Sequence, residues 1–236
     1  MVSTPIYVRR FSLWAPGMET LEDWALWKKG KKNLLSSLDL CKEGAVASAP
    51  KLDFVPMLFR RRLSDISKMV VWTVHQVSKG LEPVKNTFAS EFGEIQRQLK
   101  ISMQLLETNN VSPSHFSLSV FNSPAAASSI SEQNMAGYSA TFAGPDSFRA
   151  GLIEAVSALK SGADEERIFV FADEGIPETY APISCYPNVP IALALRLSVR
   201  SDDGAVPLKD FRSDEWPCTK TAAEQVLHFI KQQELV

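Results

Sequence analysis

The stretch Ser139-Ala140-Thr141-Phe142-Ala143-Gly144-Pro145-Asp146-Ser147-Phe148 carries the strongest information about the fold. Its first half predicts a buried strand, Gly144 and Pro145 predict a tight turn, and Phe148 begins an apolar helical pattern. Many α/β enzymes place a Cys or Ser nucleophile at such a strand-to-helix turn. Here the apex is Phe142-Ala143-Gly144. The sequence therefore indicates the turn of a catalytic site without a reactive atom at its apex.

The composition is that of an ordinary globular domain. The 236 residues are 45% hydrophobic, with a net charge of -2 and a pI near 6.0. This balance gives no general attraction to nucleic acid or to an anionic membrane. No apolar run approaches the ~20 residues of a membrane span, and Met1 to Ala15 lacks the apolar core of a signal peptide. Cys41, Cys185 and Cys218 are too far apart to suggest a disulfide framework or a metal site, so we expect a cytoplasmic protein.

Strand and helix patterns alternate along the chain. Besides the opening stretch, strand patterns cover Ile6–Trp14, Asn86–Glu91, Arg167–Asp173 and Ile191–Val199. Helical stripes cover residues 63–81, 91–108 and 148–159, and the capping box from Thr221 to Glu224 opens a last helix. This alternation predicts an α/β fold with a mixed, mostly parallel sheet of about five strands packed by helices.

We expect residues 1–236 to form a single domain, with an irregular insertion at about 15–60 and a C-terminal helix at about 221–235. The insertion holds one short helix, and Trp24 and Trp27 are expected to pack it onto the sheet. The alternation of Phe116, Leu118 and Val120 indicates a strand at an interface or in the core. A short helix of small residues is expected to follow.

Five segments resemble the N-terminal half of the β-ketoacyl synthases, which have the thiolase fold. They are Arg61–Ser67, Phe88–Glu94, Ser112–Asn122, Gly151–Ala155 and Arg167–Glu174, in the order and spacing of that family. The resemblance spans roughly Ile6 to Val199 and is strongest to the short ketosynthase-like proteins of aryl polyene clusters, described as chain length factors. It implies a thiolase-like half-fold that lacks the second thiolase half.

Two departures from the family bear on activity. In a ketosynthase the strand equivalent to Ser139–Thr141 ends in a Cys whose thiolate accepts the acyl chain, and alignment through Gly151–Ala155 puts that Cys at or beside Phe142. A full ketosynthase also continues into a second half with two catalytic His residues, whereas this chain stops before such a half fits. Its histidines, His75, His115 and His228, do not match that pattern. The resemblance therefore implies an inactive subunit, because condensation needs both the nucleophile and the His pair.

The resemblance also implies a partner. Ketosynthases are dimers whose nucleophile strands meet across a two-fold axis, and chain length factors replace one subunit of such a pair. We expect a heterodimer with a full-length ketosynthase, in which this chain shapes the acyl tunnel in polyketide, aryl polyene or fatty-acid-like biosynthesis without a cofactor. Alone, the chain is expected to be poorly soluble or self-associated, since half a fold exposes apolar surface. Candidates for the tunnel wall and the partner interface are Phe116, Leu118, Val120, Phe121, Asn122, Thr141 and Phe142.

Plainer interpretations of these residues stay open. Phe142 is as compatible with a core aromatic, and Asn122 with a cap of the following helix. The basic runs Lys28–Lys32 and Arg60–Arg62 are candidates for docking an acidic acyl carrier protein, although a solvated surface is the more common role of such runs. Two alternative functions are a purely structural interaction module and a small acyl-transfer or hydrolytic enzyme using Cys185 or Ser147. The lack of a G-x-S-x-G motif counts against the enzyme.

Overall fold

A mixed six-stranded sheet forms the centre of the computed structural model, which describes residues 5–36, 38–40, 47–183, 188–202, 204–211 and 221–236. The strand order is β3-β2-β4-β5-β1-β6. The strands are β1 (Tyr7–Trp14), β2 (Asn86–Ala89), β3 (Tyr138–Thr141), β4 (Glu166–Asp173), β5 (Ile191–Ser198) and β6 (Val206–Pro207). β2 runs parallel to β3 and β4, while β5 is antiparallel to β4 and β1. β1, β2, β3 and β4 therefore share one direction, which confirms the predicted α/β fold with a mixed sheet.

The two central strands, β4 and β5, are the most apolar in the sequence. From Arg167 to Asp173 every residue of β4 is buried, and so are all eight residues of β5. The continuous apolar run in β4 predicted cover on both faces. The alternation in β5 is typical of a strand with one solvated face, but its central place in the sheet buries both faces.

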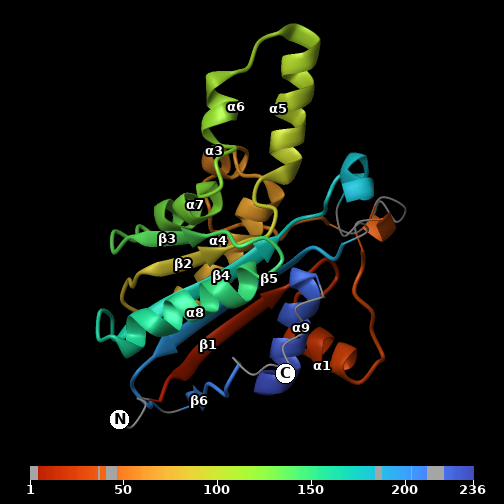
Figure 1. The fold of residues 1–236 in the computed structure, drawn as a ribbon. Coiled ribbons are helices and arrows are strands. Elements are labelled where there is room, and N and C mark those ends of the chain that lie inside the picture. The colour runs from red at the N-terminus through yellow and green to blue at the C-terminus, as the bar shows by residue number, and fades with distance from the viewer. Residues whose placement is uncertain (1–4, 37, 41–46, 184–187, 203, 212–220) are drawn as a thin grey trace.

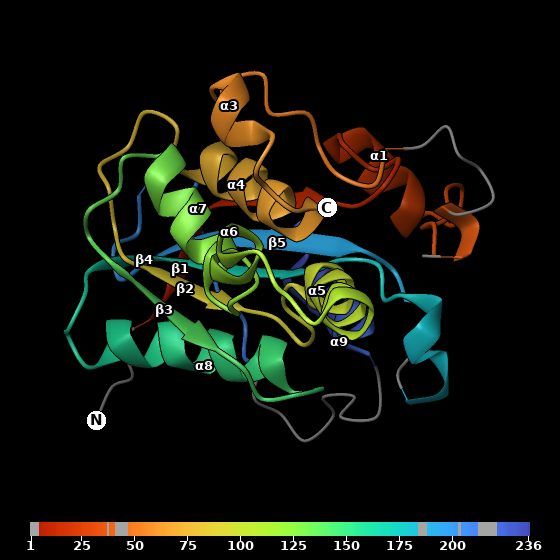
Figure 2. The same cartoon turned by 90° about the horizontal axis from the view of Figure 1, so that it is seen from above.

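Helices cover the two faces of the sheet (Figures 1 and 2). The helices are α1 (Leu21–Lys28), α3 (Met57–Arg60), α4 (Asp65–Ser78), α5 (Ile95–Thr108), α6 (Pro113–Ser117), α7 (Ser123–Ser131), α8 (Ser147–Lys160) and α9 (Ala222–Gln233), with a 3-10 helix over Glu178–Ile183. Helices α4 and α7 lie on one face, and α8 lies on the other (Figure 2). As the apolar stripe predicted, α4 buries Ile66, Val70, Val74 and Val77 against the sheet.

Small residues let α8 lie close to the sheet. A Cβ on Gly151 would come within 2.6 Å of the Ala89 Cβ and 2.9 Å of the Phe169 ring, so only glycine fits there. Phe148, at the start of α8, packs edge to face against Phe169 and Phe171. The buried helix that the small-residue pattern predicted is thus the main helix on this face.

The C-terminal half of α9 contacts α1. Thr221 and Glu224 form the predicted capping box at the start of α9, whose Val226, Phe229 and Ile230 enter the same core as Phe148. Trp24 of α1 is fully buried in that core, and the Lys231 ammonium of α9 lies 4.7 Å from the Trp27 ring. The two tryptophans therefore pack the start of the insertion onto the core, as expected.

The predicted strand at Phe116–Val120 is wrong. Residues Pro113–Ser117 form α6, and a turn closed by the Ser119 N–H on the Phe116 carbonyl follows. Pro113 at the start of α6 fixes a helical φ, which overrides the short apolar alternation. α5 and α6 together form an arm that stands away from the sheet (Figure 1). The α5 stripe buries no residue, and Leu106 is 81% exposed.

Within the described ranges, no helix is long and apolar enough to cross a bilayer.

The three cysteines, Cys41, Cys185 and Cys218, all lie outside the described residues. The structure therefore gives no information on the alternative nucleophile Cys185.

Candidate functional site

The turn that joins β3 to α8 has the predicted strand-turn-helix form. Gly144 adopts φ 57°, which a side chain would disfavour, and the Ser147 N–H donates to the Gly144 carbonyl at 3.0 Å. The Ser147 hydroxyl donates to the same carbonyl at 2.7 Å and accepts from the Ala143 N–H at 2.9 Å. Ser147 is fully buried and both of these contacts are to backbone groups of its own turn, so it closes the turn and is not presented as a nucleophile.

The side chain of Phe142 lies at the end of β3 and faces outward. It is 65% exposed, which contradicts the interpretation of Phe142 as a plain core aromatic. The prediction of a buried strand here is also wrong, because Tyr138 and Ala140 of β3 are exposed while Ser139 and Thr141 are half-buried. β3 is the outermost strand among the described residues, so its side chains are less covered than those of the central strands. The turn therefore presents an exposed aromatic ring at its start.

Three phenylalanine rings run from the core to this turn. Phe88 of β2 is fully buried, and its ring centroid lies 5.6 Å from that of Phe121. The Phe121 ring in turn meets the Phe142 ring edge to face, with centroids 5.8 Å apart. We call Phe88, Phe121 and Phe142 the aromatic row. It brings together two of the predicted tunnel residues, Phe121 and Phe142.

The other predicted tunnel residues have different exposures. Phe116 and Val120 are exposed, and Leu118 is half-buried beside the arm. Asn122 stands at the N-cap of α7 but makes no side-chain cap; its Nδ2 donates instead to the Tyr138 hydroxyl at 3.0 Å. The cap expected of Asn122 is therefore replaced by a link between the segment before α7 and the edge strand.

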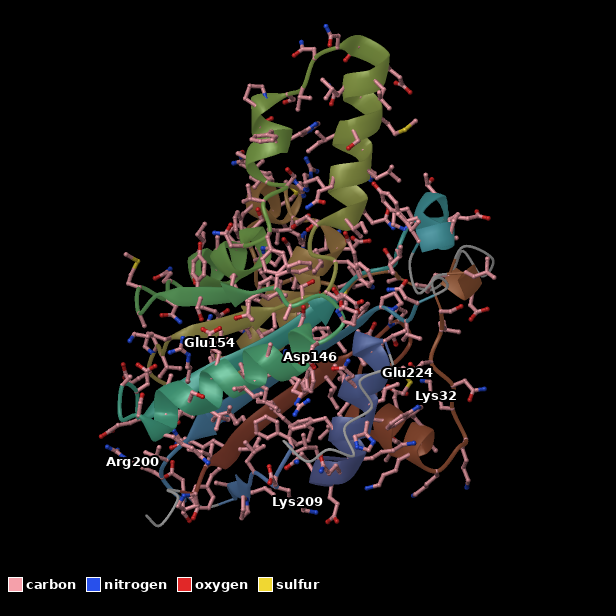
Figure 3. The ribbon with its side chains drawn as sticks, in the orientation of Figure 1. Lys32, Asp146, Glu154, Arg200, Lys209 and Glu224 are labelled. Carbon is pink, nitrogen blue, oxygen red and sulfur yellow. The ribbon has the colours of Figure 1, made fainter. Side chains whose placement is uncertain are left out.

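Thr141 points away from the aromatic row, toward α8. The hydroxyls of Thr141 and Ser139 both donate to the Glu154 carboxylate of α8, which lies between the helix and the strands (Figure 3). Arg167 of β4 donates to the Ser139 hydroxyl at 3.1 Å. β3 pairs with β2 alone among the described strands. These polar contacts therefore fix an edge strand that the sheet holds from one side.

Two buried carboxylates lie where β4 ends. Burial raises the pKa of Asp173 to about 7, against the opposing effect of hydrogen bonds from the Ser90 hydroxyl at 2.6 Å and the Phe92 N–H at 3.0 Å. Burial likewise raises the pKa of Glu174 to about 8, although the Gln96 N–H donates to it at 3.1 Å. Both acids thus hold the segment between β2 and α5 through its backbone, which is a structural use.

A cleft of about 1070 Å³ opens beside the arm, bounded by the start of α4, by α5 and α6, and by residues 174–178. Its basic lining residues are Arg61, Arg62, Lys68, Arg97 and Lys100. Lys68 pairs with Asp65 at 2.9 Å, and Arg97 with Glu94 at 3.2 Å. The second basic run lies elsewhere: Lys28 binds the carbonyl of Val236, and Lys32 pairs with Asp23. Only one of the two basic runs is thus part of a cleft.

The three histidines lie on three different helices. His75 on α4 hydrogen-bonds Glu132 at 2.9 Å and stacks on Phe54, while His115 lies exposed on α6 and His228 lies on α9. Among the described residues, no three His, Cys, Asp or Glu side chains are grouped in a way that could hold a metal ion.

A model of the β-ketoacyl synthase N-terminal domain matches residues 24–233. The chain belongs to this family. The matched region runs from within α1 to the end of α9 and includes β3, the turn with Phe142, and α8. The predicted β-ketoacyl synthase resemblance and the thiolase-like half-fold are therefore confirmed.

Solved structures of β-ketoacyl synthase relatives share this fold. The structure of the ketosynthase ApeO in complex with its chain length factor ApeC from Xenorhabdus doucetiae contains a chain that is 26% identical, with a TM-score of 0.70, over 82% of this chain and 79% of that one. The ishigamide ketosynthase/chain length factor is 12% identical with a TM-score of 0.68, over 86% of this chain and 64% of that one. A β-ketoacyl synthase from Burkholderia phymatum STM815 is 13% identical with a TM-score of 0.61, over 82% and 59%. A search of curated proteins gives no match.

Sequence patterns missed three residues that shape this β-ketoacyl synthase-like site. Phe88 appears in the sequence as an ordinary strand residue, yet it starts the aromatic row. Glu154 appears as a polar residue on an apolar helix, yet it holds the edge strand. Gly93 adopts φ 56°, and the Phe121 ring lies over its Cα. The Ser90-Glu91-Phe92-Gly93 segment was the one available signal, since a glycine after a strand often marks a special backbone conformation.

Proposed function

We propose that this chain is a catalytically inactive ketosynthase-like subunit, a chain length factor, that pairs with an active full-length ketosynthase and shapes its acyl tunnel. The observation that carries the proposal is Phe142. Its ring occupies the apex of the strand-to-helix turn at or beside the position where the family has its Cys, and it points outward. A phenyl ring has no nucleophilic atom, so acyl transfer to this position is excluded and a wall-forming role is favoured.

The edge of the sheet supports pairing with a partner. β3 has one strand neighbour among the described residues, and exposed apolar side chains occur on β3, on α7 and on the adjoining segments, namely Val120, Ile130, Met135, Tyr138 and Phe142. Contiguous exposed apolar surface marks association sites. The relative with 26% identity comes from a complex of a ketosynthase with its chain length factor, which fits the same assignment.

The proposal places the subunit in polyketide, aryl polyene or fatty-acid-like biosynthesis and treats residues 1–236 as one domain. A cytoplasmic location is part of it, since three scattered cysteines suit a reducing compartment. An acyl carrier protein is a further partner in this proposal. Its acidic surface suits the cleft lined by Arg61, Arg62 and Lys100 better than the run at Lys28–Lys32, because several basic side chains surround one concave site there.

Two alternative functions are a small acyl-transfer or hydrolytic enzyme and a purely structural module. The buried Ser147 hydroxyl argues against Ser147 as a nucleophile. Incubating the chain with malonyl-loaded carrier protein, with and without the ketosynthase, separates these functions. Transfer of the malonyl group to this chain in the absence of the ketosynthase would favour an enzyme.

The test of the tunnel role is Phe142→Ala coexpressed with the ketosynthase. We expect the complex to form and the product distribution to shift toward longer chains, since a wall residue has been removed. An intact complex with an unchanged product distribution would count against tunnel shaping and leave the structural module.

A further inference from the structure

The position of the Phe142 ring depends on residues that lie behind it. Phe121 is the one member of the aromatic row that contacts both of the others, Phe88 at 5.6 Å and Phe142 at 5.8 Å between centroids. Phe88 is fully buried in the core and therefore fixed. A displacement of the Phe121 ring is therefore expected to move the exposed Phe142 ring rather than the buried Phe88 ring.

Gly93 forms the seat of the Phe121 ring. An added Cβ at Gly93 would lie 2.9 Å from Cδ2 of Phe121, which is closer than side-chain contacts allow, and 3.4 Å from Cε2. The backbone at Gly93 is itself held, because its N–H donates to the Ser90 hydroxyl at 2.7 Å and that hydroxyl donates to the buried Asp173 at 2.6 Å. The seat cannot easily retreat from the ring, so an added methyl group at Gly93 moves the ring.

We propose that Gly93 and Phe121 are positioning residues that set where the Phe142 ring stands, and thereby the depth of the acyl tunnel. This inference rests on the proposed function and adds to it the part of the chain that fixes product length. In it, the seat at Gly93 fixes Phe121, Phe121 fixes Phe142 through the edge-to-face contact, and Phe142 meets the growing chain.

The experiment measures product length, by mass spectrometry, for complexes of this chain with the ketosynthase supplied with malonyl-loaded carrier protein. Gly93→Ala is expected to change the most abundant product by at least one extension cycle. Gly80→Ala is the matched control, since Gly80 also has a positive φ (72°) but open space where a Cβ would stand. It carries the same kind of backbone strain and is expected to leave the distribution unchanged.

Phe121→Val provides the second variant, because valine has no δ carbon to meet the added methyl group. It is expected to change product length by itself, and Gly93→Ala/Phe121→Val is expected to behave like Phe121→Val alone. A merely structural effect of Gly93 would not be masked in this way.

Wild-type product length from Gly93→Ala in an intact complex overturns the inference, and so do independent, additive effects of the two substitutions. If Gly93→Ala prevents assembly, Phe121→Val decides, and a wild-type distribution from it overturns the inference equally. Phe142→Ala distinguishes a failure of the proposed function from a failure of the positioning role. If it alters product length while the Gly93 and Phe121 variants do not, the proposed function stands and the positioning role fails. If Phe142→Ala is also silent, the tunnel role itself fails.

Discussion

The ring of Phe229 packs edge to face on the ring of Phe148, with 5.4 Å between their centroids. This contact joins the last helix to the first turn of α8, directly after the turn that carries Phe142. Because Phe148 also meets Phe169 and Phe171, the C-terminal helix is part of the core that supports the site. The stability of α9 and the geometry of the turn are therefore linked.

Phe229→Ala is expected to lower the free energy of unfolding by about 3–5 kcal/mol, because it leaves a cavity among packed aromatic rings. Urea denaturation of the purified complex measures the change. Lys231→Ala on the same helix is the control, and it is expected to lose no more than about 1 kcal/mol, the contribution of an exposed cation–π contact. Equal effects of the two substitutions would mean that α9 does not share the core.

The raised pKa of Asp173 predicts how stability depends on pH. An acid whose pKa rises on folding, here from 3.8 to about 7, favours the folded state at low pH and loses that contribution as pH rises through 7. The neighbouring carboxylate of Glu91 contributes to the shift. Since a tenfold change in proton affinity corresponds to about 1.4 kcal/mol, we expect the wild type to lose at least about 1 kcal/mol relative to Asp173→Asn between pH 5 and pH 8.

The asparagine variant suits this comparison because the Asp173 Oδ1 accepts the Ser90 and Phe92 hydrogen bonds and an amide oxygen can do the same. Asp23→Asn is the matched control. The pKa of Asp23 is lowered by its hydrogen bond with Lys32, so this acid does not titrate between pH 5 and pH 8. A constant difference between wild type and Asp173→Asn over this range contradicts the prediction.

Glu154→Ala is expected to loosen the edge strand, because the hydroxyls of Ser139 and Thr141 lose their common acceptor. Hydrogen bonds to a charged group contribute about 1.5–3 kcal/mol, so amide exchange at Tyr138–Thr141 should become at least about tenfold faster. Hydrogen exchange followed by mass spectrometry reads this out. Ser157→Ala, an exposed change on the same helix, should leave the exchange of β3 as in the wild type.

The cleft beside the arm predicts a charge-dependent interaction with the carrier protein. Arg61→Glu/Arg62→Glu is expected to weaken binding of the carrier protein to the complex by about tenfold, or about 1.4 kcal/mol, and more at low salt. Lys29→Glu/Lys31→Glu changes the same charge in the other basic run and should have little effect. Binding measured by interferometry that responds equally to both pairs would reject the cleft as the docking site.

Much of the fold was predictable because its signals are local. The apolar run of β4, the alternation of β5, the stripe of α4 and the capping box at Thr221 all act over a few residues, and each lies where the pattern predicted. The strand at Phe116–Val120 failed because Pro113 and the helix it starts outweigh an alternation of three residues. Sequence periodicity over so short a span does not separate a strand from a turn of helix.

The turn was predictable in position, but its contacts were not. The sequence pattern predicted a strand-to-helix turn at Phe142, and the structure has that turn between β3 and α8. The burial of β3 was predicted wrongly because its place at the edge of the sheet follows from the strand order, which the local sequence does not encode. The contact of Gly93 with Phe121 and the hydrogen bond of Ser139 to Glu154 join residues on different elements, and no local pattern encodes such pairs.

The edge of β3 that pairs with no described strand makes the time before assembly important for this protein. A strand that offers unpaired backbone groups is a template for any extended chain that reaches it before the right one does. The interval between synthesis and assembly then decides how much of the protein is lost to wrong pairing. If the chain pairs with a ketosynthase as proposed, the two chains have to be made close together and in matched amounts, and their supply then limits the amount of complex more than the stability of this chain does.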